Sequence, residues 1–205
     1  MGGLILAFPS WKRRRKMKLL TKKELRKQYI EERERLPKEE REKLSSKIVS
    51  KILNLPSIKK AKNILLFCPH RGEPDITPLF SWVFKEGKTL VLPKVEGEHL
   101  KLIRIKEDTN LSPGAFCILE PRDGEEVKPE EIDFSLIPGV LFDKRGYRIG
   151  YGKGYYDRIL AKLGGIKVGV CYQFQVLEEL PRDSWDKPVD LVVTEEKIYE
   201  GGKER

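Results

Sequence analysis

Short apolar segments alternate with helical patterns along this chain. Continuous apolar runs, which are typical of strands buried in a parallel sheet, occur at 63–68, 134–138, 166–172 and 189–193. Two shorter runs predict further strands at 89–93 and 100–105. Apolar residues spaced three or four apart predict helices at 18–36, 37–55 and 79–84. This order predicts a single α/β domain with a mostly parallel central sheet flanked by helices.

The first predicted helix carries a start signal and a pair of cations. Thr21 followed by Glu24 fits a capping box. Lys22 and Arg26 are four residues apart, so they share one face of the helix. They form either a solvated basic face or a pair of cations offered to phosphate. Pro37 marks the first turn of the next helix, where proline is well placed.

The segment 137–160, IPGVLFDKRGYRIGYGKGYYDRIL, holds the densest group of glycines and cations. The glycines and basic residues are Gly146, Gly150, Gly152 and Gly154, with Lys144, Arg145, Arg148 and Lys153. A strand before them and a helix after them predict a phosphate-binding loop. The alternative is a tight turn whose charges face water. Tyr147 and Tyr155 stand where a Walker A loop and a dinucleotide fingerprint need glycine, so the loop is neither of these.

Several carboxylates are candidates for the same site. Glu73 and Asp75 follow the first predicted strand, and ligands bind at the carboxyl ends of strands in open α/β sheets; the alternative for each is a loop cap. Asp157 lies in the first turn of the helix after the glycines, where it either complements the helix dipole or binds Mg²⁺ beside phosphates. Asp186 and Asp190 flank Pro188, and either reaches the site if the last strand is a neighbour.

The net charge of +9 is concentrated at the start of the 205-residue chain. Five of these charges lie at 12–16, in a segment without acids, so we predict no nucleic-acid partner. The apolar run at 4–8 precedes the charges and is too short to span a membrane, so we expect neither a signal peptide nor a membrane anchor. We predict a disordered or non-native tail at 1–17, one domain at 18–200 and a flexible tail at 201–205.

The cysteine and histidine content excludes some kinds of site. Cys68, Cys117 and Cys171 are scattered, which favours reduced thiols and a cytoplasmic protein. His70 and His99 are the only histidines, so no metal tetrad of His and Cys can form and a Ser-His-Asp triad has few candidates. We expect the protein to act as a monomer.

Four segments together resemble the 5-formyltetrahydrofolate cyclo-ligase (5,10-methenyltetrahydrofolate synthetase) family. They are KKELRK at 22–27, GEPD at 72–75, PGVLFDKRGYRIGYGKGYYDR at 138–158 and LPRDSWDKPVDLVVTE at 180–195. The glycine segment is the most specific of them. The resemblance implies a fold of the sugar-phosphate isomerase/CoA-transferase type, with ATP and Mg²⁺ as cosubstrates.

The resemblance also implies a role for particular residues. It assigns ATP binding to Lys22, Arg26, Arg148, Ile149, Gly150, Tyr151, Gly152, Lys153, Gly154, Tyr155 and Tyr156. It assigns folate binding to Cys68, Glu73, Tyr151, Gly152, Lys153, Gly154 and Tyr155. Asp157 and Asp190 are the implied Mg²⁺ ligands. Of the two adjacent tyrosines, we expect Tyr155 on the ligand side and Tyr156 in the core.

The implied reaction turns 5-formyltetrahydrofolate and ATP into 5,10-methenyltetrahydrofolate, ADP and phosphate. It needs no enzyme nucleophile, only positioning and neutralisation of the transferring phosphoryl group. Arg148 and Lys153 are the candidate catalytic cations. The alternatives are a sugar-phosphate isomerase on the same architecture, which needs a general base but no ATP, and a nucleic-acid binder that uses the basic tail.

Overall fold

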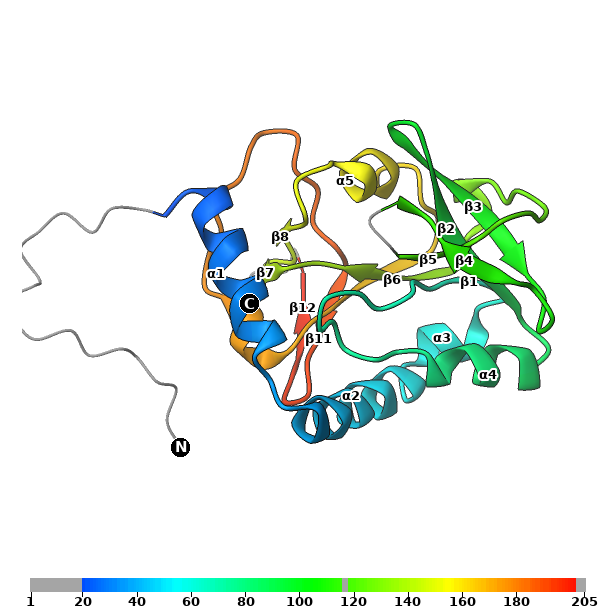
Figure 1. Ribbon diagram of the computed structural model, residues 1–205, viewed down its shortest axis with the longest axis horizontal. Coiled ribbons are helices and arrows are strands. Elements are labelled where there is room, and N and C mark those ends of the chain that lie inside the picture. Colours follow the sequence, from blue (N-terminus) through cyan, green and yellow to red (C-terminus); the bar gives the residue numbers. More distant parts are fainter. Residues whose placement is uncertain (1–19, 116–117, 202–205) are drawn as a thin grey trace, which may run out of the picture.

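A seven-stranded sheet in the order β12-β11-β9-β6-β1-β2-β3 forms the centre of the protein (Figure 1). The computed structural model describes residues 20–115 and 118–201, so the tail at 1–17, Cys117 and residues 202–205 lie outside it. Strands from β11 to β2 run parallel to their neighbours, and the edge strands β3 and β12 are antiparallel. The strands of this sheet are β1 Asn63–Leu65, β2 Thr89–Glu96, β3 His99–Ile105, β6 Phe134–Pro138, β9 Ile166–Val170, β11 Leu191–Val193 and β12 Ile198–Glu200. The predicted α/β fold with a mostly parallel sheet is confirmed.

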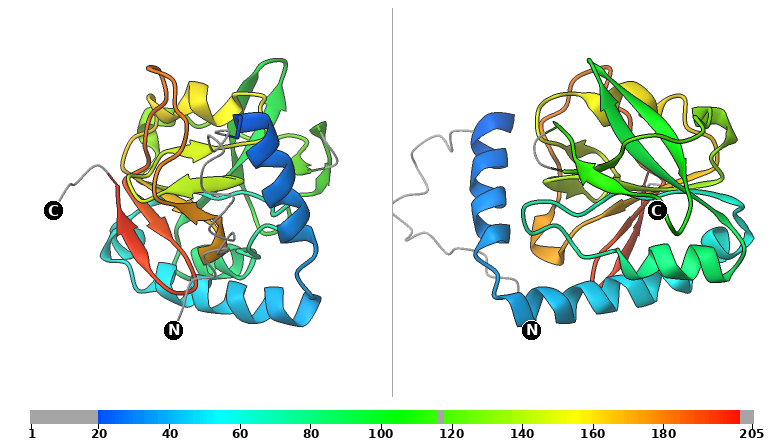
Figure 2. Two further views of the ribbon diagram at one scale, coloured as in Figure 1. Left: turned by 90° about the vertical axis from the view of Figure 1, so that its left-hand side faces the viewer. Right: turned by 45° about the vertical axis from the view of Figure 1, so that its right-hand side comes forward.

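Helices cover both faces of the sheet. The helices are α1 Lys22–Glu34, α2 Lys38–Leu53, α3 Pro56–Lys60, α4 Pro78–Lys85 and α5 Tyr155–Leu160, with 3-10 turns η3 Pro129–Glu131 and η4 Gln173–Gln175. In Figure 1, α2, α3 and α4 lie below the sheet and α5 lies above it. Figure 2 shows α1 upright beside one end of the sheet, while α2 runs beneath. The capping box at α1 is present, because Thr21 accepts from the amide of Glu24 and Glu24 accepts from that of Thr21.

The apolar runs are buried on both faces, as continuous hydrophobic strands should be. In β1, Ile64 packs in the cluster with α2 and α4, while Leu65 packs in the cluster with α5. In β6, Leu136 and Ile137 divide between the same two clusters. This two-sided burial fixes the sheet and leaves the loops at the strand ends to build a site.

The structure differs from the predictions in the short elements. The run at 63–68 is a strand only at Asn63–Leu65, and the chain then leaves the sheet. Pro37 is the residue before α2 rather than its first residue. The segment 106–131 contains a hairpin of β4 Leu111–Pro113 and β5 Leu119–Pro121. A separate small sheet of β10 Val176–Leu177, β7 Leu141–Asp143 and β8 Arg148–Ile149 was not predicted.

No helix in the described part of the chain is both long and apolar enough to cross a membrane.

Candidate active site

A cleft of about 310 Å³ opens where β1 and β6 end. One part of its wall is apolar and comes from Phe67, Cys68, Pro93, Val95, Leu100 and Ile118. The other part comes from His70, Arg71, Glu73, Arg148 and the segment 150–157. The cleft therefore lies at the carboxyl ends of parallel strands, where open α/β sheets bind ligands.

The glycine segment is divided between two structures, which corrects the prediction of one loop. Gly146 turns the hairpin between β7 and β8, with φ of 90°, and a Cβ there would lie 2.4 Å from the carbonyl oxygen of Val189. Lys144 in this hairpin pairs with Glu178, so it does not serve the cleft. Only Gly150, Gly152 and Gly154 belong to the loop that lines the cleft.

The cleft loop is shaped by two arginines. A Cβ at Gly150 would lie 2.7 Å from Nη1 of Arg148, and one at Gly152, where φ is 94°, would lie 3.2 Å from Cζ of Arg26. Arg26 also donates from Nε to the carbonyl oxygen of Gly150 at 2.6 Å. The structure thus brings Arg26 to the loop, as the sequence suggested. Ile149 is buried under the loop in the cluster that joins it to α1.

Arg148 is a buried cation with an incomplete set of partners. Its side chain is 4% exposed; Nη2 bonds Oδ1 of Asp157 at 3.0 Å and Nη1 donates to the carbonyl oxygen of Pro138 at 3.3 Å. Nε is buried and has no hydrogen-bond partner among the residues that the structure describes. Burial lowers the pKa of Arg148, and the charge of Asp157 opposes this shift. A buried donor without an acceptor is costly, so the site suits an incoming anion.

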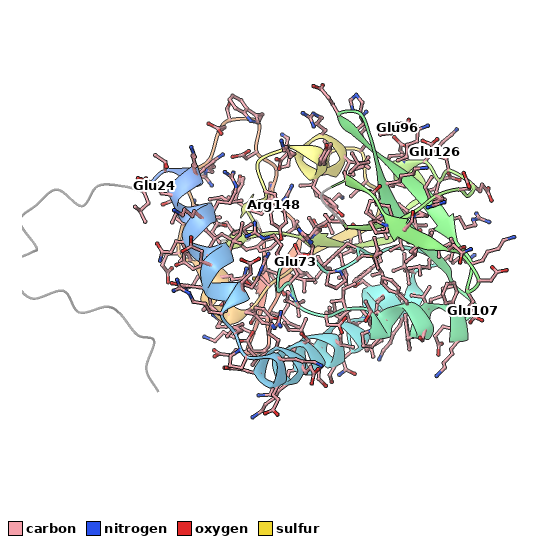
Figure 3. The ribbon with its side chains drawn as sticks, viewed as in Figure 1. Glu24, Glu73, Glu96, Glu107, Glu126 and Arg148 are labelled. Carbon is pink, nitrogen blue, oxygen red and sulfur yellow. The ribbon has the colours of Figure 1, made fainter. Side chains whose placement is uncertain are left out.

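Glu73 faces the cleft through a hydrogen-bonded network. Its Oε1 accepts from the hydroxyl of Tyr151 at 3.0 Å and its Oε2 accepts from the amide of His70 at 2.9 Å. Burial raises the pKa of Glu73, while Arg33 opposes the shift. Figure 3 shows Glu73 and Arg148 in the interior near α1, whereas Glu96 and Glu126 lie on the outside. Asp75, by contrast, caps its own loop by accepting from the amide and hydroxyl of Thr77.

Sequence reasoning missed Arg33, which is 0% exposed. Its guanidinium donates to the carbonyl oxygens of Arg71 and Gly139 and to the hydroxyl of Tyr151. Arg33 thereby ties α1 to both loops of the cleft. The signal was available, because Arg33 is seven residues after Arg26 and so lies on the same face of the helix.

Lys22 lies beside the site rather than in it. Its Nζ pairs with Asp183 at 2.7 Å and with Asp186 at 2.8 Å. Burial acts to raise the pKa of Asp186, but the hydrogen bond from Lys22 and the charge of Arg148 hold it below its ordinary value. Asp186 therefore connects Lys22 electrostatically to the cleft.

The structure does not bring Asp190 together with Asp157. The Oδ2 atom of Asp190 accepts from the amide of Lys167 at 2.8 Å, at the start of β9. That is the amino end of the parallel strands, whereas Arg148 and Asp157 lie at the carboxyl end, beside Pro138. The described residues contain no group of three or more His, Cys, Asp or Glu that could hold a metal ion.

The remaining predicted residues line the cleft. Lys153 does so from the loop, and Tyr155 and Tyr156 both do so from the start of α5. Tyr156 also packs on the core cluster and lies under Arg148, whose Cζ is 5.5 Å from the ring centre. Burial raises the pKa of Cys68 to about 11, so this thiol stays protonated near neutral pH and is a poor nucleophile.

Comparison with known proteins gives one consistent family. The model of the 5-formyltetrahydrofolate cyclo-ligase family matches residues 19–195. A probable 5-formyltetrahydrofolate cyclo-ligase of Schizosaccharomyces pombe is 34% identical over 75% of this chain and 85% of its own. The NMR structure of Aquifex aeolicus 5,10-methenyltetrahydrofolate synthetase is 52% identical, with a TM-score of 0.83 over 91% of this chain and 95% of that one. The Mycoplasma pneumoniae synthetase is 32% identical, with a TM-score of 0.70 over 86% and 99%. None of these matches favours a sugar-phosphate isomerase.

Proposed function

We propose that this chain, which belongs to the 5-formyltetrahydrofolate cyclo-ligase family, converts 5-formyltetrahydrofolate to 5,10-methenyltetrahydrofolate with ATP. The observation that carries the proposal is Arg148, a buried guanidinium that lines the cleft and whose Nε lacks an acceptor in the described chain. A phosphate oxygen is the acceptor that suits it, since arginine pairs strongly with phosphate. The cleft also has an apolar part, which includes Phe67, Pro93 and Leu100, and this part suits a folate ring.

In the proposed reaction the γ-phosphoryl group of ATP moves to the formyl oxygen and ADP leaves. N10 then bonds to the formyl carbon and loses its proton, while the carbon–oxygen bond breaks and phosphate carries that oxygen away. The protein has to align the reactants and neutralise the phosphoryl charge, for which Arg148 and Lys153 are placed in the wall of the cleft. The protonated thiol of Cys68 agrees with a reaction that uses no enzyme nucleophile.

We assign ATP to the end of the cleft formed by 148–156 and held by Arg26. Lys22 joins this end through Asp186, so its ammonium group is a further cation on α1 that phosphates can attract. The folate takes the part of the cleft with Cys68 and Glu73, and residues 151–155 contact both ligands. Buried Cys68 and Cys171, both unpaired, support a reducing compartment such as the cytoplasm.

The donor set fits Mg²⁺, which commonly takes one or two carboxylates together with phosphate oxygens. Asp157 lines the cleft and its carboxylate is 46% exposed, so it is the first proposed ligand. We assign the second place to Asp186 rather than Asp190, because Asp186 acts on Arg148 whereas Asp190 lies at the other end of the strands. When bound, the ion would neutralise phosphate charge. Calorimetry should show weaker Mg-ATP binding in Asp186→Asn and unchanged binding in Asp190→Asn; the reverse result would restore Asp190.

The direct test is incubation with 5-formyltetrahydrofolate and Mg-ATP while the absorbance of the methenyl product is followed. We expect product with ATP and none when ATP is omitted, which also separates the reaction from that of an isomerase. Arg104→Ala, an exposed arginine on β3, is the control for variants of the cleft arginines. Absence of product from folded protein with both substrates present would overturn the proposal.

A further inference from the structure

Glu120 is a second buried carboxylate in the wall of the cleft, and it is not part of the site described so far. It lies in β5, is 8% exposed and lines the cleft beside Leu119. Its Oε1 accepts from the amide of Val95 in β2, which pairs with Leu100 of β3, so the carboxylate lies at the end of the cleft that these strands form. Sequence reasoning missed Glu120 because the segment 106–131 shows no periodicity that separates a buried position from an exposed one.

The surrounding backbone makes room for this carboxylate. A Cβ at Gly114, on the chain next to β4, would lie 2.1 Å from Oε2 of Glu120, so only glycine leaves the carboxylate in place. Oε1 accepts from the amide of Val95 at a long 3.3 Å, and the amide of Ala115 is a second donor. Burial raises the pKa of Glu120, since water that would solvate the carboxylate is displaced.

The two ends of the cleft therefore differ in the chemistry that they offer. The end with Arg148 and Lys153 offers cations, whereas the end with Glu120 offers an acceptor among Phe67, Pro93 and Leu100. A flat apolar ring that carries N–H donors on one edge suits the second end. In the proposed substrate, the pyrimidine edge of the pterin is such a group, because N3–H and the 2-amino group are adjacent donors.

We propose that Glu120 recognises the N3–H and 2-amino edge of the pterin. This inference rests on the proposed function and deepens it by fixing the orientation of the folate. The pterin lies at the apolar end, its donor edge is paired with the carboxylate, and the formyl group points toward Arg148. Two parallel charge-assisted hydrogen bonds hold such a ring more tightly and more selectively than neutral ones.

The test compares wild type, Glu120→Gln and Glu126→Gln. Glu126 is an exposed residue on the outside of the same region, paired with Lys101, so it is a matched control (Figure 3). Calorimetry without ATP should show that Glu120→Gln binds 5-formyltetrahydrofolate at least about tenfold more weakly, as expected for loss of a charged hydrogen bond. The KM for ATP should stay within about twofold, because the phosphates bind at the other end.

An analogue of the substrate without the 2-amino group distinguishes recognition from a structural role. Wild type should discriminate against it by about tenfold or more, since one of the two charge-assisted hydrogen bonds to the buried carboxylate is lost. Glu120→Gln should lose most of that discrimination. A merely structural glutamate would weaken both ligands equally, and that result would overturn the inference.

A second variant covers the case in which Glu120→Gln fails to fold. Gly114→Ala keeps the carboxylate but displaces it, so it should also weaken folate binding and reduce discrimination. Equal folate binding in wild type and in either folded variant would overturn the role of Glu120 while the proposed function stands. Wild type that binds no folate at all would instead overturn the proposed function.

Discussion

Two buried arginines hold consecutive carbonyl groups at the end of β6, and they differ in how completely they are bonded. Arg33 donates to Gly139, Arg71 and Tyr151, so its Nε, Nη1 and Nη2 atoms are all engaged. Arg148 donates to Pro138 and Asp157 but leaves Nε buried without an acceptor in the described chain. Buried polar groups are normally satisfied, so this difference separates an arginine that holds the fold from one that awaits a ligand.

The largest expected effect is on folding, from Arg33→Met. The substitution leaves the carbonyl groups of Gly139 and Arg71 without their donor and removes a cation whose charge acts on Glu73. Breaking a buried charged network in this way costs about 3–5 kcal/mol of unfolding free energy. Urea denaturation measures it. A loss of activity without a loss of stability would show that Arg33 acts on the ligand directly.

The matched substitution Arg148→Met should have the opposite profile. We expect kcat to fall by about a hundredfold or more, as when a donor to developing charge is removed. The unfolding free energy should change by only about 1 kcal/mol, because Asp157 is half exposed and can be solvated when its partner is lost. Steady-state kinetics and urea denaturation on the same samples check both. Near-normal turnover with lost stability would make Arg148 a second structural arginine.

A smaller effect is expected when Arg148 is displaced but kept. Gly150→Ala places a methyl group 2.7 Å from Nη1 of Arg148, so the buried guanidinium must shift. We expect kcat to fall by about tenfold, or 1.4 kcal/mol of barrier, with little change in stability. Gly87→Ala is the control, since it adds a methyl group in open space at φ of +64° and should cost stability without affecting kcat. Full activity in Gly150→Ala would show that the position of Arg148 tolerates a shift.

The sequence predicted the large elements because their apolar runs are long enough to show a period. The strand Phe134–Pro138 is found at its predicted bounds, and the helix predicted at 18–36 forms at Lys22–Glu34. The hairpin around Gly146 was missed because β8 has only two residues, too few for any pattern. Gly146 was therefore counted with glycines that serve a different structure.

The carboxylates show where pattern reasoning can be extended. Glu73 follows a parallel strand and lies in the cleft at the carboxyl ends of the strands. Asp190 precedes a parallel strand and lies at the amino ends. The same rule about strand ends that favoured Glu73 would have placed Asp190 away from it. The position of Glu120 was beyond such reasoning, because it depends on how an irregular segment folds back over Val95.

The smallest expected effect concerns Glu73, which is connected to Arg33 through the hydroxyl of Tyr151. Burial raises the pKa of Glu73 above its ordinary value of 4.5, so the folded state holds this proton more tightly than the unfolded chain does. Its contribution to stability is full below that value and is lost as pH rises through the folded pKa.

Glu73→Gln cannot titrate, and its amide can still bond Tyr151, so at neutral pH it should cost about 1 kcal/mol or less. Urea denaturation from acidic to neutral pH should show the stability of wild type falling relative to the variant. Parallel curves would mean that the pKa of Glu73 is the same in the folded and unfolded states, so that the charge of Arg33 cancels the effect of burial. Folate binding by the same variant then decides between the two roles, because an unchanged dissociation constant would leave Glu73 as a cap of its own loop.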